Sequence, residues 1–396
     1  MAILAVNAGS STLKFSVHPL VGTGVSDPVL TGTIQGLEPA GQPAMDWFWQ
    51  GQHHQQPLPS TPGSTFESAL RALQSLLLSL PALPGLRAVA HRVVHGGQHL
   101  QHSTQVTPEV LHTLEQLNPL APLHQPHNLA GIRAFAAVFP TLPQVACFDT
   151  AFHATLPREE FCFALPQALS DEGVRRYGFH GLSYQSIMGT LQSCSARTNG
   201  RTLMAHLGNG ASLCATLQGR SQATTMGFSA LDGLVMGTRC GSIDPGVLLY
   251  LLEQGWDHDR IQALLYRQSG LLGVSGIAAD MRTLRASTEP TAQFAIELFT
   301  RRVVRATGEL SACIGGLDVL AFSGGIGEND ALLRADVAQR LAYLGVRVDA
   351  TLNARAVQGH AAWAIHTPDS AVEVWVVPTD EGRVAAAEAA ALVLQA

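Results

Sequence analysis

The chain has 396 residues, of which 46% are hydrophobic and 14% are charged, and its formal net charge at pH 7 is −6. This length favours two or three domains with full-sized hydrophobic cores. No basic run typical of nucleic-acid or membrane-surface binding is present, and the longest apolar run, Leu76–Leu78, is too short to span a bilayer. An anionic substrate would therefore have to be bound by a few local arginines.

Six cysteines are scattered along the chain without a Cys-x-x-Cys spacing, which indicates reduced thiols. The first residues lack the basic start and the long apolar run of a signal peptide. We therefore expect a cytoplasmic protein that binds neither nucleic acid nor a membrane.

The chain begins with two strand-like segments joined by a turn of small residues. Residues 2–6 are apolar, and residues 13–17 alternate between apolar and polar side chains after the turn. Glycine and hydroxyl side chains such as Ser11 leave backbone N–H groups exposed, so the turn could accept a phosphate. Lys14, the only lysine of the chain, fits a phosphate-binding role, although biased codon usage would also explain it.

A second turn of the same kind lies about halfway along the chain. Residues 203–207 lead into Gly208-Asn209-Gly210, and residues 213–217 lead out. Two matching turns suggest a duplicated unit, and turns that face each other across a cleft could hold a polyphosphate from both sides. Two ordinary glycine hairpins are the alternative interpretation.

The remaining elements alternate between strands and helices, which predicts an α/β protein. A polar loop is expected at 50–63, followed by a helix with a capping box at 64–67 and an end at Pro81. We place the domains at 1–150 with the C-terminal helix 382–396, and at 151–381. The other expected elements are strands at 88–94, 144–148, 317–322 and 372–377, and helices starting at Pro108, Pro126, Pro245, Pro290 and near Asp330.

Residues 323–329 form a glycine-rich turn between a strand and a helix, where backbone N–H groups could bind phosphate or ribose. The turn lacks the Walker A pattern, and Asp330 stands where Gly-x-Gly-x-x-Gly needs its last glycine. By itself this signal is weak.

His91 and His95 have the spacing of two zinc ligands on a helix. Their segment is predicted to be a strand, in which four residues span roughly 13 Å. This distance is too long for two ligands of one ion. We therefore expect core or hydrogen-bonding histidines.

Two carboxylates and two arginines follow apolar segments. Asp149 and Glu381 each stand just past a strand, where they could hold magnesium or simply cap a helix. Arg92 and Arg239 lie in glycine-flanked turns and could neutralise a transferring phosphoryl group, although either alone could form a surface ion pair.

Seven segments, in this order along the chain, resemble the acetate kinase family: 7–11, 91–97, 148–153, 178–181, 206–210, 236–239 and 325–329. The resemblance spans nearly the whole chain and is highly specific. It implies the actin-like ATPase fold of the acetate and sugar kinase/actin/heat-shock ATPase superfamily, with two duplicated ribonuclease-H-like domains and a nucleotide cleft between them. It also implies a homodimer that uses ATP and Mg²⁺, with Mn²⁺ as a substitute.

The resemblance also implies roles for individual residues. The catalytic set is Asn7, Arg92, Asp149, His180 and Arg239, and the metal ligands are Asn7, Asp149 and Glu381. The nucleotide set is Asn209, Gly210, Asp280, Met281, Arg282, Gly325, Ile326 and Asn329, to which the glycine turns add Ser11, Lys14, His206 and Gly327. The acyl substrate would contact Arg92, Val94, Leu123, Phe179 and Ala230.

Five positions depart from the family pattern. Ala230 replaces a proline that would border the acyl pocket, which leaves the preferred chain length open. Leu182, Tyr184, Ser242 and Gly382 replace a threonine, a histidine, an aspartate and a glutamate.

We therefore predict a reversible, direct in-line phosphoryl transfer from ATP to a short carboxylate, acetate or also propionate. A carboxylate is already ionised, so positioning and charge neutralisation suffice. The alternatives are a propionate kinase, a sugar or polyol kinase with Asp149 as its base, and a non-enzymatic nucleotide switch. Apolar pocket residues argue against a sugar, and a switch would not need both arginines.

Overall fold

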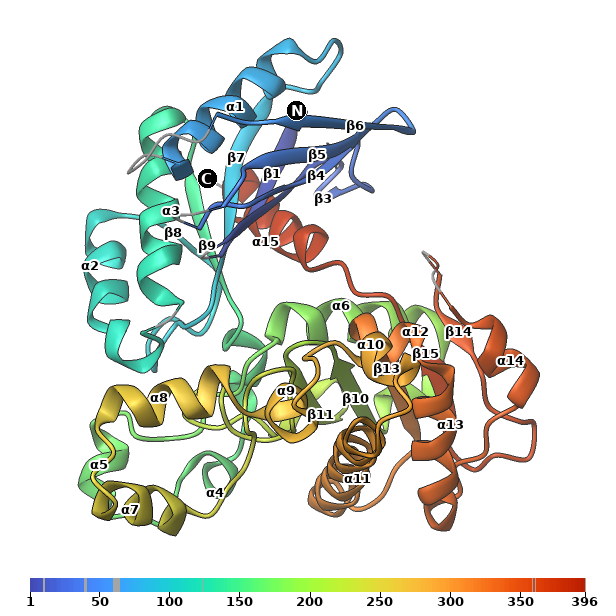
Figure 1. Ribbon diagram of the computed structural model, residues 1–396. Helices are drawn as coiled ribbons and strands as arrows, with labels where there is room; N and C mark the ends of the chain where they lie inside the picture. The colour runs from blue at the N-terminus through green and yellow to red at the C-terminus, as the bar shows by residue number, and fades with distance from the viewer. Residues whose placement is uncertain are drawn as a thin grey trace. The chain divides into compact units, whose positions relative to one another are not determined.

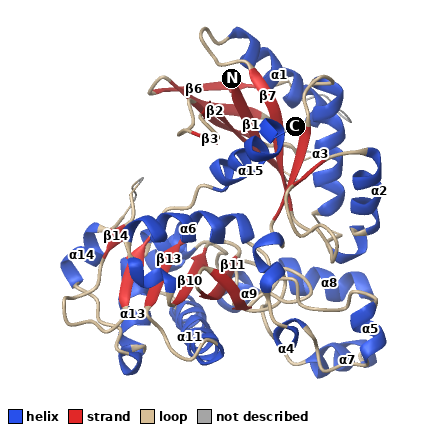
Figure 2. Cartoon of the chain, turned by 180° about the vertical axis from the view of Figure 1, so that it is seen from behind, coloured by secondary structure: helices blue, strands red, loops and turns tan. Residues whose placement is uncertain are grey.

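The computed structural model describes the chain except residues 10, 39–40, 60–64, 123, 358, 360 and 396. The chain divides into two compact units, one formed by Met1–Ala151 with Asp380–Ala396 and the other by Phe152–Thr379. Each unit is built on one sheet with helices on both faces (Figures 1 and 2), so the predicted α/β class is confirmed.

The first unit has a nine-stranded sheet in the order β6-β5-β4-β2-β1-β7-β9-β8, with β3 paired to β2. β1, β7 and β9 run parallel to one another, while β2, β4, β5 and β6 form antiparallel pairs on one side of them. The strands are β1 (Ala2–Ala8), β2 (Thr12–Val21), β3 (Gly24–Val25), β4 (Leu30–Gln35), β5 (Ala44–Trp49), β6 (Gln52–Pro57), β7 (Leu86–Val93), β8 (Thr104–Gln105) and β9 (Gln144–Phe148).

Strand alternation sorts the side chains of the first unit between two layers of helices. Leu4 and Val6 of β1 belong to the core that includes Leu70 and Leu73, under α1 and α3, and α15 packs on the opposite face (Figures 1 and 2). Because successive side chains of a strand point to opposite faces, odd-numbered residues of β1 face α15. The helices of this unit are α1 (Thr65–Ser79), α2 (Pro108–Gln116), η1 (Asn118–Leu120), α3 (Gln125–Val138) and α15 (Glu381–Gln395).

The second unit has a six-stranded sheet in the order β12-β11-β10-β13-β15-β14. Helix α6 covers one face, where Tyr184 and Ile187 pack with Met204 and Cys214, and the long helix α11 covers the other (Figure 1). The strands are β10 (Arg201–Leu207), β11 (Ala211–Leu217), β12 (Arg220–Thr224), β13 (Val319–Ser323), β14 (Trp363–Ala364) and β15 (Glu373–Val376).

The helices of the second unit lie before β10 and between β12 and β15 in the sequence. They are η2 (Ala151–Thr155), which begins at the unit boundary, α4 (Arg158–Phe161), α5 (Gln167–Asp171), α6 (Gly181–Cys194), η3 (Ala196–Asn199), α7 (Pro245–Glu253), α8 (His258–Arg267), α9 (Gly270–Ser275), α10 (Met281–Ala286), α11 (Pro290–Cys313), α12 (Gly324–Asn329), α13 (Ala331–Arg340), η4 (Ala342–Leu344) and α14 (Ala350–Arg355).

The two sheets share one topology. The run β4-β2-β1-β7-β9 of the first unit corresponds to β12-β11-β10-β13-β15 of the second. In both, a central strand pairs antiparallel with the next strand of the chain on one side and parallel with later strands on the other. The predicted duplication is therefore confirmed.

Two predicted segments differ in the structure. Part of the expected polar loop, residues 52–57, forms the edge strand β6, whose His54 stacks on Trp47 with ring centroids 5.2 Å apart. An edge strand can be polar because much of it faces water. The capping serine of the expected box at 64–67 lies outside the described residues.

The glycine-rich segment 323–329 was expected to be a turn with a helix beginning near Asp330. Residues Gly324–Asn329 instead form the short helix α12, and α13 follows with Asp330 as its N-cap, where the side chain accepts the N–H of Leu333. Gly324 makes the abrupt entry into α12 at a φ of +76°, which a side chain would strain.

His91 and His95 are buried and hydrogen-bonded, as predicted. His91 Nε2 lies 2.7 Å from Gln144 Oε1, and His95 Nδ1 accepts the N–H of Gly97 at 2.8 Å. Among the described residues, no group of three or more histidine, cysteine, aspartate or glutamate side chains could hold a metal ion. No helix within the described residues is long and apolar enough to cross a membrane. All six cysteines are free thiols.

His91 is expected to make the first unit sensitive to acid. Burial lowers the pKa of His91 from 6.5 to about 4, against the opposing effect of its bond to Gln144. The unfolded chain therefore binds a proton that the folded chain refuses, and stability is lost as pH falls from 6.5 towards 4, by roughly 2 kcal/mol at pH 5.

Replacing His91 by Gln removes this titration and should weaken the loss of stability between pH 7.5 and pH 5. Urea unfolding at both pH values measures it. His102→Gln, at an exposed position, is the control and should behave as the wild type. An unchanged pH dependence in His91→Gln would contradict the prediction.

Candidate active site

Three polar side chains of the first unit meet at one edge of its sheet. Asn7 is near the end of β1, Arg92 near the end of β7, and Asp149 directly after β9. Since these strands are parallel, their carboxyl ends lie at the same edge, where α/β proteins bind ligands. The strand period places Asn7 and Arg92 on the face that α15 covers, where Glu381 begins that helix.

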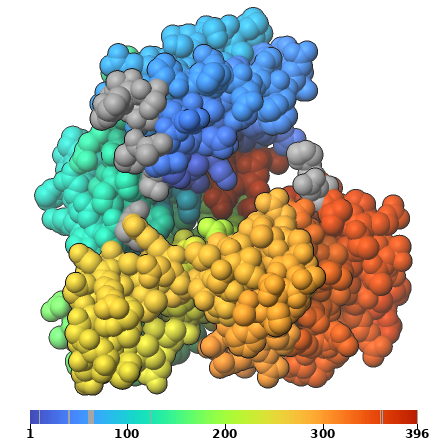
Figure 3. Space-filling model, in the orientation of Figure 1, coloured from blue at the N-terminus to red at the C-terminus, as the bar shows by residue number. Residues whose placement is uncertain are grey.

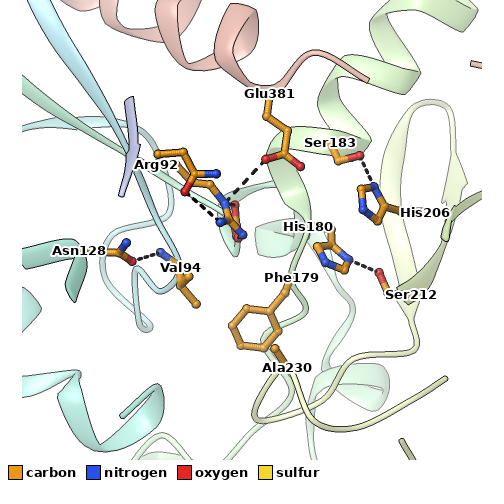
Figure 4. Close-up of polar contacts among 12 residues, drawn as sticks. Arg92, Val94, Asn128, Phe179, His180, Ser183, His206, Ser212, Ala230 and Glu381 are labelled. Carbon is orange, nitrogen blue, oxygen red and sulfur yellow. Dashed lines mark hydrogen bonds and ion pairs between the residues drawn. The ribbon is translucent and has the colours of Figure 1, made fainter. Parts of the chain in front are cut away.

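Arg92 is the centre of this group. Its Nε and Nη2 donate to the two carboxylate oxygens of Asp149 at 3.0 and 2.5 Å, and its Nη1 donates to Asn7 Oδ1 at 3.2 Å. Glu381 Oε2 lies 3.8 Å from Nε (Figure 4). Burial disfavours the charged guanidinium, but the two carboxylates outweigh it and raise the pKa of Arg92 above its ordinary value. The group is a preformed, charged cluster held by a bidentate ion pair.

Asn128 ties the two central strands together beneath this cluster. Its Nδ2 donates to the carbonyl of Ala8 at 3.0 Å, and its Oδ1 accepts the N–H of Val94 at 3.0 Å (Figure 4). Sequence reasoning missed Asn128, for which a lone amide within an apolar helix was the only signal. Lys14 pairs across the strands with Asn7 and is exposed, so the predicted phosphate lysine stands beside the cluster.

In the second unit, His180 lies at a strained entry to α6. It has a left-handed backbone with φ 60° and ψ 25°, which costs roughly 1–2 kcal/mol for a residue with a Cβ. Gly178 precedes it at φ +75°, and a Cβ there would lie 2.6 Å from the ring of His153. His153 Nε2 in turn donates to the carbonyl of Phe179 at 2.9 Å. The surroundings therefore fix the conformation of residues 178–180.

The imidazole of His180 stacks on that of His206 with ring centroids 4.3 Å apart. Each ring is bonded at Nδ1 to a serine, His180 to Ser212 at 2.8 Å and His206 to Ser183 at 2.7 Å (Figure 4). Both serines are fully buried. Sequence reasoning missed them, because nothing in the spacing marks a serine as the partner of a distant histidine.

Two nitrogen-bearing side chains converge on the second glycine turn. A Cβ placed on Gly210 would lie 3.2 Å from His180 Nε2 and 4.0 Å from Arg239 Nη1. Arg239 Nη1 also donates to the carbonyl of Ala230 at 2.8 Å. The turn itself is fixed by the 2.9 Å bond from the N–H of Gly237 to the carbonyl of Asn209. This arrangement suits an anion.

A pocket of about 1010 Å³ adjoins the same turn. Predicted nucleotide residues that line it are Asn209, Asp280, Met281, Arg282, Gly325, Ile326 and Asn329. Gly327 is buried instead, and its carbonyl accepts from Arg334. Sequence reasoning missed Arg285 and Asp330, which line the pocket and pair at 3.1 Å.

The predicted acyl-pocket residues are divided between the units. Val94 belongs to the first unit, and Phe179 and Ala230 belong to the second. Val94 and Phe179 are buried. Leu123 lies outside the described residues.

The oxygen atoms around Arg92 are of the class that magnesium prefers. Asn7 supplies an amide oxygen, and Asp149 and Glu381 supply carboxylates. All three groups are directed at the guanidinium of Arg92. The chemistry of this set therefore fits a magnesium ion held partly by protein and partly by water or phosphate.

Known proteins of one family are similar to this chain along nearly its whole length. A family model described as the acetokinase family matches residues 2–387. Acetate kinases of Rhodopseudomonas palustris and Nitrobacter hamburgensis are 48% and 44% identical, covering 96% and 99% of this chain and 95% and 96% of their own. A solved propionate kinase from Francisella tularensis has TM-score 0.89 and 34% identity, covering 98% of both chains. An acetate kinase from Porphyromonas gingivalis has TM-score 0.87 and 33% identity, covering 99% of both.

The ion pair between Arg92 and Asp149 is expected to stabilise the first unit. Asp149 is 2% exposed and Arg92 24% exposed. Removing either partner therefore leaves the other charge largely buried without its ion-pair partner. We expect a coupling free energy on the order of 2 kcal/mol in a double-mutant cycle of Arg92→Ala and Asp149→Ala.

The cycle is measured by urea unfolding. A second cycle on the exposed pair of Arg133 and Glu115 serves as the control and should give at most about 1 kcal/mol. Equal coupling in the two cycles would show that the Arg92 pair does not stabilise the unit.

Proposed function

Because the chain belongs to the acetokinase family, we propose that it transfers the terminal phosphoryl group of ATP to acetate, giving acetyl phosphate and ADP. The match along residues 2–387 is the observation that carries this proposal. The transfer is reversible and direct, with the carboxylate oxygen attacking in line.

Charge repulsion is the main obstacle to this reaction. Acetate is ionised at neutral pH, so it needs no general base, but it must approach an anionic phosphate. Arg92 and Arg239 neutralise this charge, which is the main protein contribution to phosphoryl transfer. The bonds of Arg92 to Asp149 and Asn7 support this role, because they fix the guanidinium before substrate binds.

The second unit binds the nucleotide. The Gly208–Gly210 turn and the side chains of His180 and Arg239 contact the phosphates, and the adjoining pocket takes the nucleoside between α10 and α12. The volume of about 1010 Å³ and the exposed Asp280 and Arg282 at its rim support this assignment.

Asn7, Asp149 and Glu381 hold magnesium. When bound, the ion neutralises phosphate charge and aligns the phosphate oxygens. The three oxygen donors around Arg92 support this assignment. Asp149 thus acts as an anion that orients Arg92 and the metal, and a carboxylate substrate requires no base from it.

A homodimer is supported by helix α7, which lies within the yellow part of the second unit in Figure 3. Val247, Leu249, Tyr250 and Leu252 are between 43% and 64% exposed, and exposed apolar clusters of this kind mark protein contacts. Because a two-fold dimer buries the same patch on both copies, we propose that α7 packs on a second copy.

Free thiols at all cysteines support a cytoplasmic location.

The function is tested with ATP, magnesium, acetate and hydroxylamine, which traps acyl phosphate as a hydroxamate. Wild type should form hydroxamate, and Arg239→Ala should lower kcat by roughly 10²–10³, the effect of losing one transition-state donor. Arg220→Ala, at an exposed position of β12, is the matched control. No hydroxamate from wild type would reject the proposal and favour a sugar kinase or a nucleotide switch.

Glu381 is expected to set the magnesium requirement. Replacing Glu381 by Ala removes one oxygen ligand, so the magnesium concentration for half-maximal rate should rise. The rate at saturating magnesium should fall less than the rate at low magnesium. Glu109→Ala, another glutamate in the first turn of a helix of this unit, controls for helix effects. Superimposable magnesium titrations of Glu381→Ala and wild type would remove Glu381 from the metal site.

Ala230 is expected to widen the acyl pocket relative to the proline of the family pattern. One further buried methylene contributes roughly 0.8 kcal/mol, so propionate should be used nearly as well as acetate. Ala230→Pro should shift kcat/KM towards acetate, because proline refills the space and keeps the carbonyl that Arg239 uses.

The measurement compares kcat/KM for acetate, propionate and butyrate in wild type, Ala230→Pro and Ala230→Gly. A neighbouring side chain that fills the gap is the alternative. Identical ratios in all three proteins would show that position 230 does not set chain length.

A further inference from the structure

A chain of hydrogen bonds runs from the core of the second unit to His180. The hydroxyl of Tyr184 lies 2.5 Å from Ser212 Oγ, and Ser212 Oγ lies 2.8 Å from His180 Nδ1. Tyr184 and Ser212 are both fully buried, with 0% exposure. This series of hydrogen bonds therefore begins at Tyr184 in the protein interior and leads to His180, which lies beside the Gly210 turn.

The fold brings these three residues together by simple periodicity. His180 and Tyr184 are one helical turn apart at the start of α6, so they share a face. Ser212 is opposite His206 in the register of β10 and β11, and Cys214, two residues along the same strand, packs in the core that contains Tyr184. The serine thus points at α6 from the sheet.

The direction of the protons follows from the donors that must be satisfied. Ser212 Oγ is the polar partner that the described residues give the Tyr184 hydroxyl. A fully buried phenol that did not donate would leave its proton unsatisfied. Tyr184 therefore donates to Ser212, and the single hydroxyl proton of Ser212 is donated to His180 Nδ1.

The same unit contains a second histidine whose proton can be placed independently. His153 Nε2 must donate, because its partner is the carbonyl of Phe179, so Ser221 donates to His153 Nδ1 at 2.9 Å. Burial lowers the pKa of His153 to about 4, which keeps the ring neutral. A serine that donates to Nδ1 is thus already used in this fold to select the Nε2–H tautomer.

We propose that Tyr184 and Ser212 are positioning residues that hold His180 in the neutral tautomer with its proton on Nε2. That proton faces the Gly210 turn, since a Cβ on Gly210 would lie 3.2 Å from Nε2. The other tautomer would direct a lone pair at the same place and repel an anion. The proposal rests on the proposed function only for the identity of the acceptor, which is a phosphate oxygen of ATP.

Tyr184 suits this task better than a second imidazole would. It departs from the histidine of the family pattern, and burial raises the pKa of its phenol well above the ordinary value of 10.0. The phenol therefore keeps its proton at neutral pH, whereas an imidazole can change from donor to acceptor near neutral pH.

The tautomer is tested directly by NMR. Wild type labelled with ¹⁵N-histidine should show the His180 ring protonated at Nε2 and unprotonated at Nδ1 in the absence of substrate, with the resonances assigned by their loss in His180→Gln. In Tyr184→Phe and Ser212→Ala the ¹⁵N chemical shifts of the two ring nitrogens should move towards the average of both tautomers. A wild-type ring protonated at Nδ1 would overturn the proposal.

Kinetics supply the second readout. Ser212→Ala should lower kcat by about 10-fold, by analogy with the lower end of the range for losing a hydrogen-bond partner that orients a metal-bound histidine. A smaller fall is expected in Tyr184→Phe, with little change in the KM for acetate. Tyr177→Phe removes another buried phenol of this unit, bonded to the carbonyl of Gly173 at 2.8 Å, and is the matched control.

The outcomes separate the two proposals. Tyr184→Phe with unchanged tautomer and unchanged kcat, or an equal loss in Tyr177→Phe, would overturn the role of the phenol. If wild type formed no acyl phosphate but its His180 carried the proton on Nε2, the proposed reaction would fail and the tautomer device would stand.

Discussion

The guanidinium of Arg92 is the point on which the first unit depends for its chemistry. It donates two hydrogen bonds to Asp149 and one to Asn7, and Glu381 Oε2 lies 3.8 Å from its Nε. Each of these three residues comes from a different element of the fold. An arginine can organise such a group because its planar fork fixes direction as well as charge. The cation thus favours one register of β1 and β7, since a one-residue slip of either strand would turn Asn7 or Arg92 to the other face of the sheet.

The duplicated topology gives the second unit the same edge but a different use of it. In the first unit, the ends of β1, β7 and β9 bring together the amide of Asn7 and the charged side chains of Arg92 and Asp149. In the second, the ends of β10 and β13 lead into the Gly208–Gly210 turn and into α12, which present backbone and a wide pocket. One scaffold therefore produced a half suited to a small charged group and a half suited to a nucleotide. The C-terminal helix belongs to the first unit, which is how Glu381 reaches Arg92.

Periodicity predicted the elements whose apolar side chains repeat, and failed where the repeat is absent. The helix at Leu70 and Leu73 and the alternation of residues 13–17 were correct because those side chains form the core. The strand β6 was missed because its sequence is almost wholly polar, and α12 because glycines are poor helix formers whose helix here depends on tertiary contacts such as Arg334 to the carbonyl of Gly327. Pairings such as Tyr184 with Ser212 could not be predicted, since two buried polar residues carry no mark of each other in sequence.

Backbone strain marks the place where local preference gives way to function. Four non-glycine residues of the described chain have positive φ: Gln50, Ala82, His180 and Gln218. Gln50 and Gln218 each precede a glycine in a strand-connecting turn, and Ala82 follows the end of α1, so ordinary turn geometry accounts for them. His180 instead opens a helix, without a side-chain cap, and its strain is maintained by Gly178 and His153. A conformation that surrounding residues enforce against local preference is typical of a site that needs a side chain in one orientation. In His180 that orientation brings the ring to Ser212 on one side and to the glycine turn on the other.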